Sequence, residues 1–308
     1  MWFKNLQLYR FTKPFEYTAE TLEAALQTRP ARLCGPHEEM CQGWGSPMGR
    51  TGEMLVHAAN GFLMICATKE EKILPASVVR EHVNERVEKI EATQARKVRK
   101  KERDNLRDDV MTELLPRALS RTLHTFAFID PKEGLLVVDT SSSGKAEAFT
   151  ALLRKTLGSL PVVPPTPNEA PYAIMTEWLI KSNHPPEFGV EEECELRSAD
   201  IEGSVVRCKR LDLASPEVKL HLKEGKLVSK LALNWRDRIT FVLDENFAIK
   251  RLRFLEIVQD QADDVEADDA AARFDVDFSI MTLELSLFIK QLFEAFGGEN
   301  VDALDEAA

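Results

Sequence analysis

The chain has 308 residues, of which 44% are hydrophobic and 30% charged, proportions typical of a globular protein with a sizeable core. It contains no apolar run of about 18 residues, and it begins MWFKNL without the apolar segment of a signal peptide, so we expect a cytoplasmic protein with no membrane span. A formal net charge of -11 would argue against a nucleic-acid partner if the charge were evenly spread. It is uneven: residues 96–107 carry seven basic and two acidic side chains, whereas residues 259–308 carry fourteen acidic and two basic ones.

The first part of the chain predicts strands and a short helix around one loop. The aromatic-rich stretch 2–11 predicts a strand, and residues 18–28 predict a helix. Five glycines within residues 35–52 predict a loop. Residues 54–67 then predict a hairpin that turns at Asn60-Gly61, a dipeptide favoured in tight hairpin turns.

A single long helix is predicted over residues 75–107. Proline is accepted in a first helical turn, as at Pro75, and nothing interrupts the pattern before Pro116. Apolar residues at helical spacing form one stripe: Val79, Val83, Val87 and Ile90. Such a helix would be about 50 Å long, more than a compact domain needs, so we expect part of it to project.

The middle of the chain predicts a second hairpin and a domain boundary. The apolar runs TFAFID and LLVVDT predict the hairpin, and a helix follows over residues 143–157. The proline-rich segment PVVPPTPNEAP (161–171) is the best candidate boundary. We therefore divide the chain into two α+β halves, residues 1–165 and residues 166–308.

The C-terminal half predicts further strands and an apolar helix. Residues 188–209 resemble strands, residues 216–224 a helix, and the runs KLVSKLALNW, RITFVL and FAIKRLRFL an antiparallel meander. A helix over about 278–296, ended by Gly297-Gly298, is apolar beyond one narrow stripe, so we expect it in a buried core or a dimer contact. Irregular mixing of strands and helices favours an α+β fold with mixed antiparallel sheets.

The basic run is the first candidate for DNA contact. On a continuous helix, one face would carry four cations able to follow a line of phosphates: Arg96, Lys100, Arg103 and Arg107. The other cations of the run are Lys97, Arg99 and Lys101. A solvated helix face is the alternative, since charge runs of this kind are common.

Two weaker basic groups complete the candidate DNA-binding residues. Arg117 and Arg121 are i and i+4 neighbours beside Pro116, and they could extend a basic surface or cap a helix end. In the C-terminal half, strand alternation would place Arg207 and Lys209 on one face and Arg210 on the other. The same half also contributes Lys250, Arg251 and Arg253. An ordinary polar sheet face is the alternative interpretation.

Signals of catalysis and metal binding are weak. The SSSGK segment at 141–145 lacks the first glycine and the final hydroxyl residue of a phosphate-binding loop. Cys34, His37 and Cys41 have no evident fourth ligand and match no common zinc spacing. The five cysteines are sparse and odd in number, as expected of reduced thiols: Cys34, Cys41, Cys66, Cys194 and Cys208. We expect no metal, no cofactor and no enzymatic activity.

The acidic residues of 260–277 leave a second function open. Asp263, Asp264 and their neighbours could serve a metal-dependent nuclease or other DNA-processing enzyme, although they lack the EF-hand glycine and the strand context of a two-metal site. A solvated acidic linker is the simpler interpretation. A third possibility is a protein-binding scaffold whose charged helix pairs with an acidic partner.

Several phrases of the sequence together resemble the RdgC family of recombination-associated proteins. Each phrase is weak alone, but the ordered set is specific and spans nearly the whole chain. The phrases are MWFKNL (1–6), KEEKILP (69–75), LLPRALSR (114–121), LLRKTLGSLPVVP (152–164), TEWL (176–179), KLALNW (230–235), KRLRF (250–254) and DVDFSIMTLEL (275–285).

The resemblance implies a homodimer, joined head to head and tail to tail into a ring whose positively charged hole admits duplex DNA. It also implies binding with little sequence preference, restraint of RecA-driven recombination and association with the nucleoid. Whether single-stranded DNA is a further partner stays open. Leu119 stands in LLPRALSR where the resemblance leads us to expect an aromatic residue, so no base-stacking role is carried over to it.

Overall fold

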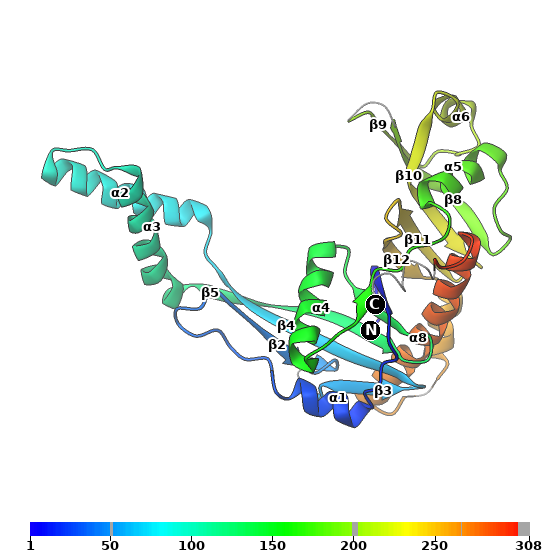
Figure 1. The fold of residues 1–308 in the computed structure, drawn as a ribbon, viewed down its shortest axis with the longest axis horizontal. Coiled ribbons are helices and arrows are strands. Elements are labelled where there is room, and N and C mark those ends of the chain that lie inside the picture. The colour runs from blue at the N-terminus through cyan, green and yellow to red at the C-terminus, as the bar shows by residue number, and fades with distance from the viewer. Residues whose placement is uncertain (50–51, 199–202, 266, 301–308) are drawn as a thin grey trace.

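The computed structural model describes residues 1–49, 52–198, 203–265 and 267–300 and confirms the predicted α+β class. A curved sheet runs through the molecule, helices cover parts of both its faces, and a pair of helices projects from one end, so that the chain forms an open arc (Figure 1). We expected several sheets from the sequence. In the described part of the chain, the strands instead form one antiparallel sheet of twelve.

The order of the strands across the sheet is β2-β4-β5-β6-β1-β12-β11-β10-β8-β9, with β3 also paired to β4 and β7 to β1. Their bounds are β1 (Leu6–Phe11), β2 (Met40–Gly45), β3 (Val56–Ala59), β4 (Phe62–Ile73), β5 (Leu119–Asp130), β6 (Leu135–Asp139), β7 (Val162–Val163), β8 (Phe188–Ser198), β9 (Val205–Lys209), β10 (Lys226–Trp235), β11 (Ile239–Asp244) and β12 (Ile249–Phe254). The meander predicted in the C-terminal half is confirmed as β10-β11-β12.

Both hairpins predicted in the N-terminal half are also confirmed, the first as β3-β4 and the second, formed by TFAFID and LLVVDT, as β5-β6. β3 and β4 meet at Asn60-Gly61, whose φ angles of 51° and 84° lie in the left-handed region that a two-residue hairpin turn requires. β4 and β5 have 12 residues each and pair from Leu63↔Ile129 to Ile73↔Leu119. Because they are longer than the other N-terminal strands, they extend beyond them as a ribbon, and the projecting helices stand at its end (Figure 1).

The loop predicted over residues 35–52 is wrong at its centre, where β2 pairs along the edge of β4. Gly43 permits a close approach instead of a turn, because a Cβ there would lie 2.5 Å from the carbonyl oxygen of Pro30. The next residue, Trp44, is only 1% exposed and anchors the strand in the core. Glycine in this segment therefore reflects tight packing of a strand.

Eight α-helices lie in the described ranges: α1 (Ala19–Leu26), α2 (Ala76–Gln94), α3 (Lys100–Leu114), α4 (Ser143–Leu157), α5 (Pro171–Lys181), α6 (Pro216–Lys223), α7 (Glu256–Asp263) and α8 (Ala270–Ala295). α1 and α4 pack on one face of the N-terminal strands, and α8 packs on the other face. α4 begins in the SSSGK segment, where the Ser142 hydroxyl accepts the backbone N–H of Lys145 as a helix cap. None of these helices is both long enough and apolar enough to cross a membrane.

The single helix predicted over residues 75–107 is wrong, because α2 ends at Gln94 and α3 folds back across it (Figure 1). Ala95 adopts a left-handed backbone, with φ 49° and ψ 34°, and ends α2 without a glycine or proline. Folding back buries the apolar stripe, since Val79 and Val83 pack with Val110 in a small separate core. A straight helix would leave that stripe in water. We call α2 and α3 the arm.

The C-terminal helix occupies the buried core, which is one of the two places that its apolar composition predicted. Its buried side chains recur at helical spacing: Phe278, Met281, Leu285, Phe288, Ile289, Leu292 and Phe293. They belong to one cluster with residues of β1, β4 and β5 as well as residues of β8–β12. The N-terminal ammonium, 2.6 Å from the Asp277 carboxylate, ties the start of the chain to the same helix. The division at residue 165 stays a prediction.

Phe288 provides a test of how much the fold depends on α8. Its ring is fully buried and lies 4.8 Å from that of Phe241 and 5.6 Å from that of Trp235, between centroids. We expect Phe288→Ala to lower the free energy of unfolding by about 3–5 kcal/mol, because it leaves a cavity in the core. The neighbouring Leu287 is 44% exposed, so Leu287→Ala should change that free energy by no more than about 0.5 kcal/mol. Denaturant titration followed by circular dichroism measures both, and equal effects would contradict the assignment.

Candidate nucleic-acid interface

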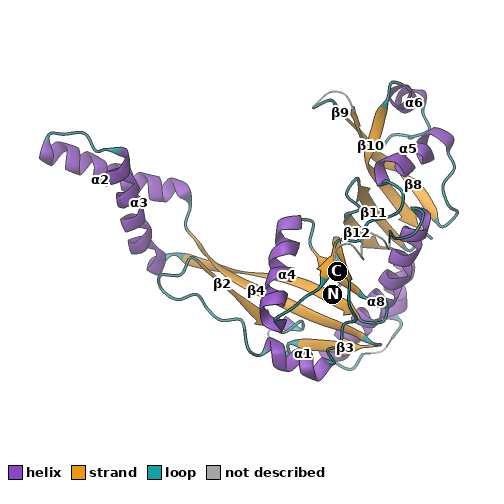
Figure 2. Ribbon diagram, in the orientation of Figure 1, coloured by secondary structure: helices purple, strands orange, loops and turns teal. Residues whose placement is uncertain are grey.

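The C-terminal part of the sheet has one uncovered face. α5, α6 and α8 all lie on the outer side of β8–β12, so the opposite face turns toward the hollow side of the arc (Figure 2). Strand alternation explains its character. In β10, for example, Leu231 and Leu233 point into the core while Lys230 and Ala232 lie on the uncovered side. We call this uncovered side of β8–β12 the open face.

Basic side chains gather on the open face. Two adjoining hollows of about 520 and 450 Å³ lie there and share Glu193, Lys209, Val242 and Arg251. Seven cations line them, namely Arg207, Lys209, Arg210, Lys230, Lys250, Arg251 and Arg253, against four carboxylates, namely Glu191, Glu192, Glu193 and Glu195. The open face is therefore locally basic in a protein whose total charge is acidic.

Glu195 organises the middle of the open face. Its carboxylate lies 2.9 Å from Arg207 Nε and 3.0 Å from Lys230 Nζ, and it is only 6% exposed. Burial opposes its ionisation, but the hydrogen bonds from Arg207 and Lys230 outweigh this and hold its pKa at about 2. Arg197 of the same strand lies 3.3 Å away, so the ionised carboxylate pairs with three cations, one each from β8, β9 and β10.

A second carboxylate, Glu193, holds the cations on both sides of it. Arg251 lies 2.8 Å from it and Lys209 3.9 Å, and the hydrogen bond from Arg251 lowers the pKa of Glu193. Arg210 and Arg253 are exposed and form no ion pair with another described residue. The open face therefore combines cations that are held in place with cations that are free to pair with an anionic ligand.

Of the three cations predicted on one strand, Arg207 and Lys209 lie where alternation predicts, and Arg210 does not. Arg207 and Lys209 share the open face, as alternation predicts, while Val206 and Cys208 turn inward. Arg210 was expected on the opposite face, but β9 ends at Lys209 and Arg210 has a left-handed backbone with φ 53°. It therefore lines the same hollow as Lys209. Sequence reasoning missed Lys230, although the alternation of KLVSKLALNW could have placed it on a polar face.

The arm cations do not form the predicted stripe. Arg96 lies in the turn after α2 and pairs with Glu102 at 2.7 Å, while Arg103 donates to Asn84 of α2. Lys97 and Arg99 lie in the same turn, outside both helices. On α3, Lys100, Lys101, Arg103 and Arg107 are all exposed. All seven belong to α3 or to the turn before it, and none lines the hollows of the open face. Arg103 and Arg107 line a hollow with Leu74 and Ala76 at the start of α2. Contact between these seven cations and DNA stays a prediction.

The LLPRALSR segment lies where the arm joins the sheet. Arg117 closes a 3-10 turn, Leu115–Arg117, whereas Arg121 belongs to β5 and pairs with Glu71 across the strands. They are therefore not neighbours on one helix. Leu119 is 78% exposed at the start of β5, opposite Ile73, which is 45% exposed. The two side chains form an exposed apolar pair at the base of the arm.

Four of the acidic residues of 260–277 make structural contacts. Asp263 pairs with Arg273, Asp269 caps α8, Asp275 lies 3.1 Å from His57, and Asp277 holds the N-terminal ammonium. Glu266 lies outside the described residues. In the part of the chain that the structure describes, no three of these carboxylates converge as metal ligands would.

Comparison with known proteins finds the same family along the whole chain. The family model described as "Putative exonuclease, RdgC" matches residues 1–299. The recombination-associated protein RdgC of Aeromonas hydrophila is 50% identical over 300 residues, covering 97% of this chain and 99% of the relative. The proteins of that name from Psychromonas ingrahamii and Pseudomonas syringae pv. syringae are 49% and 46% identical, over 97% and 98% of this chain and 99% of each relative.

The lowered pKa of Glu195 predicts an acid-sensitive contribution to stability. Its folded-state pKa of about 2 lies below the ordinary value of 4.5, so the stabilisation is complete above that ordinary value and is lost as the pH falls toward 2. The difference in unfolding free energy between wild type and Glu195→Gln should therefore shrink between about pH 5 and pH 2. Glu192→Gln removes an equal charge from an exposed site and serves as the control. A difference for Glu195→Gln that stays constant with pH would contradict the role of its charge.

Proposed function

This chain belongs to the RdgC family, and we propose that it is a non-catalytic DNA-binding protein that holds duplex phosphates against the open face. One observation carries the proposal: seven cations outnumber four carboxylates in the two hollows of a sheet face that no helix covers in the described structure. The names of its relatives support a recombination-associated role. Binding to the chromosome would place it in the cytoplasm, at the nucleoid.

The proposed complex is a ring made of two copies of the chain. Each subunit is an arc with the open face on its hollow side and the arm at one end, a shape that two copies could close around a duplex (Figure 1). Encircled DNA would be less available to a RecA filament. The protein would therefore restrain recombination by occupying the DNA, without touching RecA itself. Phosphate contacts fix position but read no sequence, so binding should tolerate any duplex.

The open face can be tested against the arm with two variants that remove equal charge. Lys209, Arg210 and Arg253 are exposed cations of the open face, and Lys97, Lys100 and Lys101 are exposed cations of the arm. We expect Lys209→Ala/Arg210→Ala/Arg253→Ala to weaken duplex binding and to reduce the log–log salt slope by roughly one unit per lost phosphate contact. Lys97→Ala/Lys100→Ala/Lys101→Ala should leave that slope unchanged.

Binding is measured by fluorescence anisotropy over a range of salt concentrations on duplexes of different sequence, with circular dichroism to confirm folding. Equal losses in the two variants would show a general effect of net charge, and a loss confined to the arm variant would move the interface to the arm. A preference of several kcal/mol for one duplex sequence would also contradict the proposal. Absence of DNA binding at low salt would favour the scaffold alternative.

The ring requires a dimer before DNA is added. Light scattering of the free protein at micromolar concentration should report twice the chain mass of 34.8 kDa. A monomeric mass at that concentration would be incompatible with the ring.

A metal-dependent nuclease is the second candidate, and the description of the matching family model is the observation that favours it. Circular and linearised plasmid, each incubated with the protein and Mg²⁺ or Mn²⁺, distinguish the two functions, because an exonuclease degrades DNA only from its ends. Metal-dependent degradation or nicking that disappears in Asp263→Ala/Asp264→Ala would establish the enzyme. Circular and linear DNA that both stay intact under conditions of full binding would support the non-catalytic function.

A further inference from the structure

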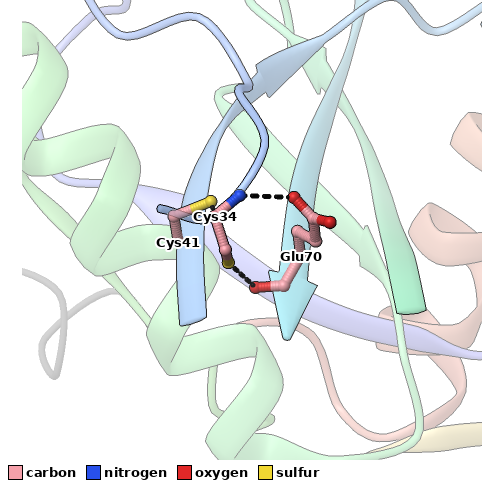
Figure 3. Close-up of side chains that lie close together, drawn as sticks. All are labelled: Cys34, Cys41 and Glu70. Atoms are coloured by element: carbon pink, nitrogen blue, oxygen red, sulfur yellow. Dashed lines mark hydrogen bonds between the residues drawn. The ribbon is translucent and has the colours of Figure 1, made fainter. Parts of the chain in front are cut away.

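Two cysteines and a glutamate converge near the base of the arm, outside the open face. The Sγ atoms of Cys34 and Cys41 are 3.3 Å apart, and one ligand atom each from Cys34, Cys41 and Glu70 lie within 4.8 Å of one another (Figure 3). Among the described residues, this is the one group of three such side chains close enough to share a metal ion. The spacing of Cys34 and Cys41 was visible in the sequence, but the third member, Glu70, was not.

The sheet and one loop bring the three residues together. Cys41 of β2 and Glu70 of β4 are direct cross-strand partners, so their side chains are neighbours. Cys34 lies in the loop before β2, and its backbone N–H donates to the Glu70 carboxylate at 2.6 Å. Its thiol donates to the backbone carbonyl of Glu70 at 3.2 Å, as Figure 3 shows. The arrangement is therefore held by backbone contacts as well as by side chains.

The charge of the group is poorly compensated. Glu70 is 7% exposed, and its carboxylate accepts hydrogen bonds from the Ser120 hydroxyl and the Cys34 backbone N–H. No cation of the described chain reaches ion-pairing distance of Glu70. A nearly buried anion without a direct cationic partner is unusual, and two thiols stand beside it.

We propose that Cys34 Sγ, Cys41 Sγ and the Glu70 carboxylate form a binding site for a divalent cation of the Zn²⁺ class. Thiolate sulfur and carboxylate oxygen are both ligands of zinc, and three protein ligands leave a fourth position for water or for a nearby side chain. Binding converts both thiols to thiolates and releases two protons to solvent, so no oxidant or reductant is needed. The bound cation supplies the positive charge that Glu70 lacks.

A disulfide between the two cysteines is the competing chemistry, and the geometry favours it less. Both thiols donate hydrogen bonds to carbonyl oxygens, Cys34 to Glu70 and Cys41 to Arg32 at 3.0 Å. A disulfide would also leave Glu70 without a counterion, whereas a metal ion balances the negative charge of the carboxylate and of the thiolates.

The bound cation would hold together the segments at the base of the arm. It joins the loop before β2 and the edge strand β2 to the ribbon of β4 and β5, and Ser120 of β5 already hydrogen-bonds the same carboxylate at 2.5 Å. β4 leads directly into the arm. Fixing these segments together would stabilise the strand end from which the arm projects, a role distinct from that of the open face.

The test titrates Co²⁺ into the full-length protein after treatment with a chelator and a phosphine reductant. We expect a sulfur-to-metal charge-transfer band in the near ultraviolet that saturates at about one ion per chain, with release of about two protons per ion. Cys34→Ser and Cys41→Ser should each abolish saturable binding. Glu70→Gln should keep a weaker band and bind at least about tenfold less tightly.

Cys208→Ala is the matched control, because Cys208 and Cys194 are also cross-strand partners but lie in the apolar core without a carboxylate. It should bind Co²⁺ like wild type. Loss of the band in Cys208→Ala, or its absence in folded wild-type protein, would overturn the proposal. So would a thiol assay of the denatured, unreduced protein that finds only three of the five thiols, with Cys34 and Cys41 joined in the peptide map.

Discussion

The packing of α8 beneath the sheet is the interaction on which the rest of the molecule depends. A twelve-stranded sheet that bends into an arc cannot bury both of its faces against itself, so its two parts need a common support. α8 provides this support because its aromatic side chains contact β3 near its start and β10 and β11 farther along. Each fully buried aromatic ring contributes about 1.5–3 kcal/mol by leaving water. The open face exists because α8, α5 and α6 all occupy the opposite side.

Local sequence signals predicted the elements well where a turn or a periodic pattern defines them. The Asn60-Gly61 turn, the TFAFID hairpin and the spacing of α8 all have a local chemical cause. The long helix failed because its break at Ala95 has no local cause: the chain turns there since Val79 and Val83 need a partner, and α3 supplies Val110. A usable signal was the scarcity of apolar residues between Ile90 and Leu106, where the stripe does not continue.

The candidate interface was only partly predictable for a related reason. Alternation along one strand places Arg207 and Lys209 on the same face, and the five residues of β9 are enough to predict this. Partners on different strands depend on register, which distant contacts decide. The pairing of Glu195 with both Arg207 and Lys230, and of Cys41 with Glu70, could not be read from a single sequence without knowing which strands are adjacent.

A sheet face also suits the binding mode proposed for this family member. Side chains two residues apart on a strand are about 6.8 Å apart, and neighbouring strands are about 4.8 Å apart, so the cations form a grid on the scale of backbone phosphates. A recognition helix lies in the major groove and directs side chains at base edges, whereas a broad concave face stays outside the groove and meets phosphates of any sequence. Glu193 and Glu195 hold that grid rigid, but their charges reduce the net attraction. In the proposed complex, the open face would therefore have a lower affinity for DNA but fixed cation positions.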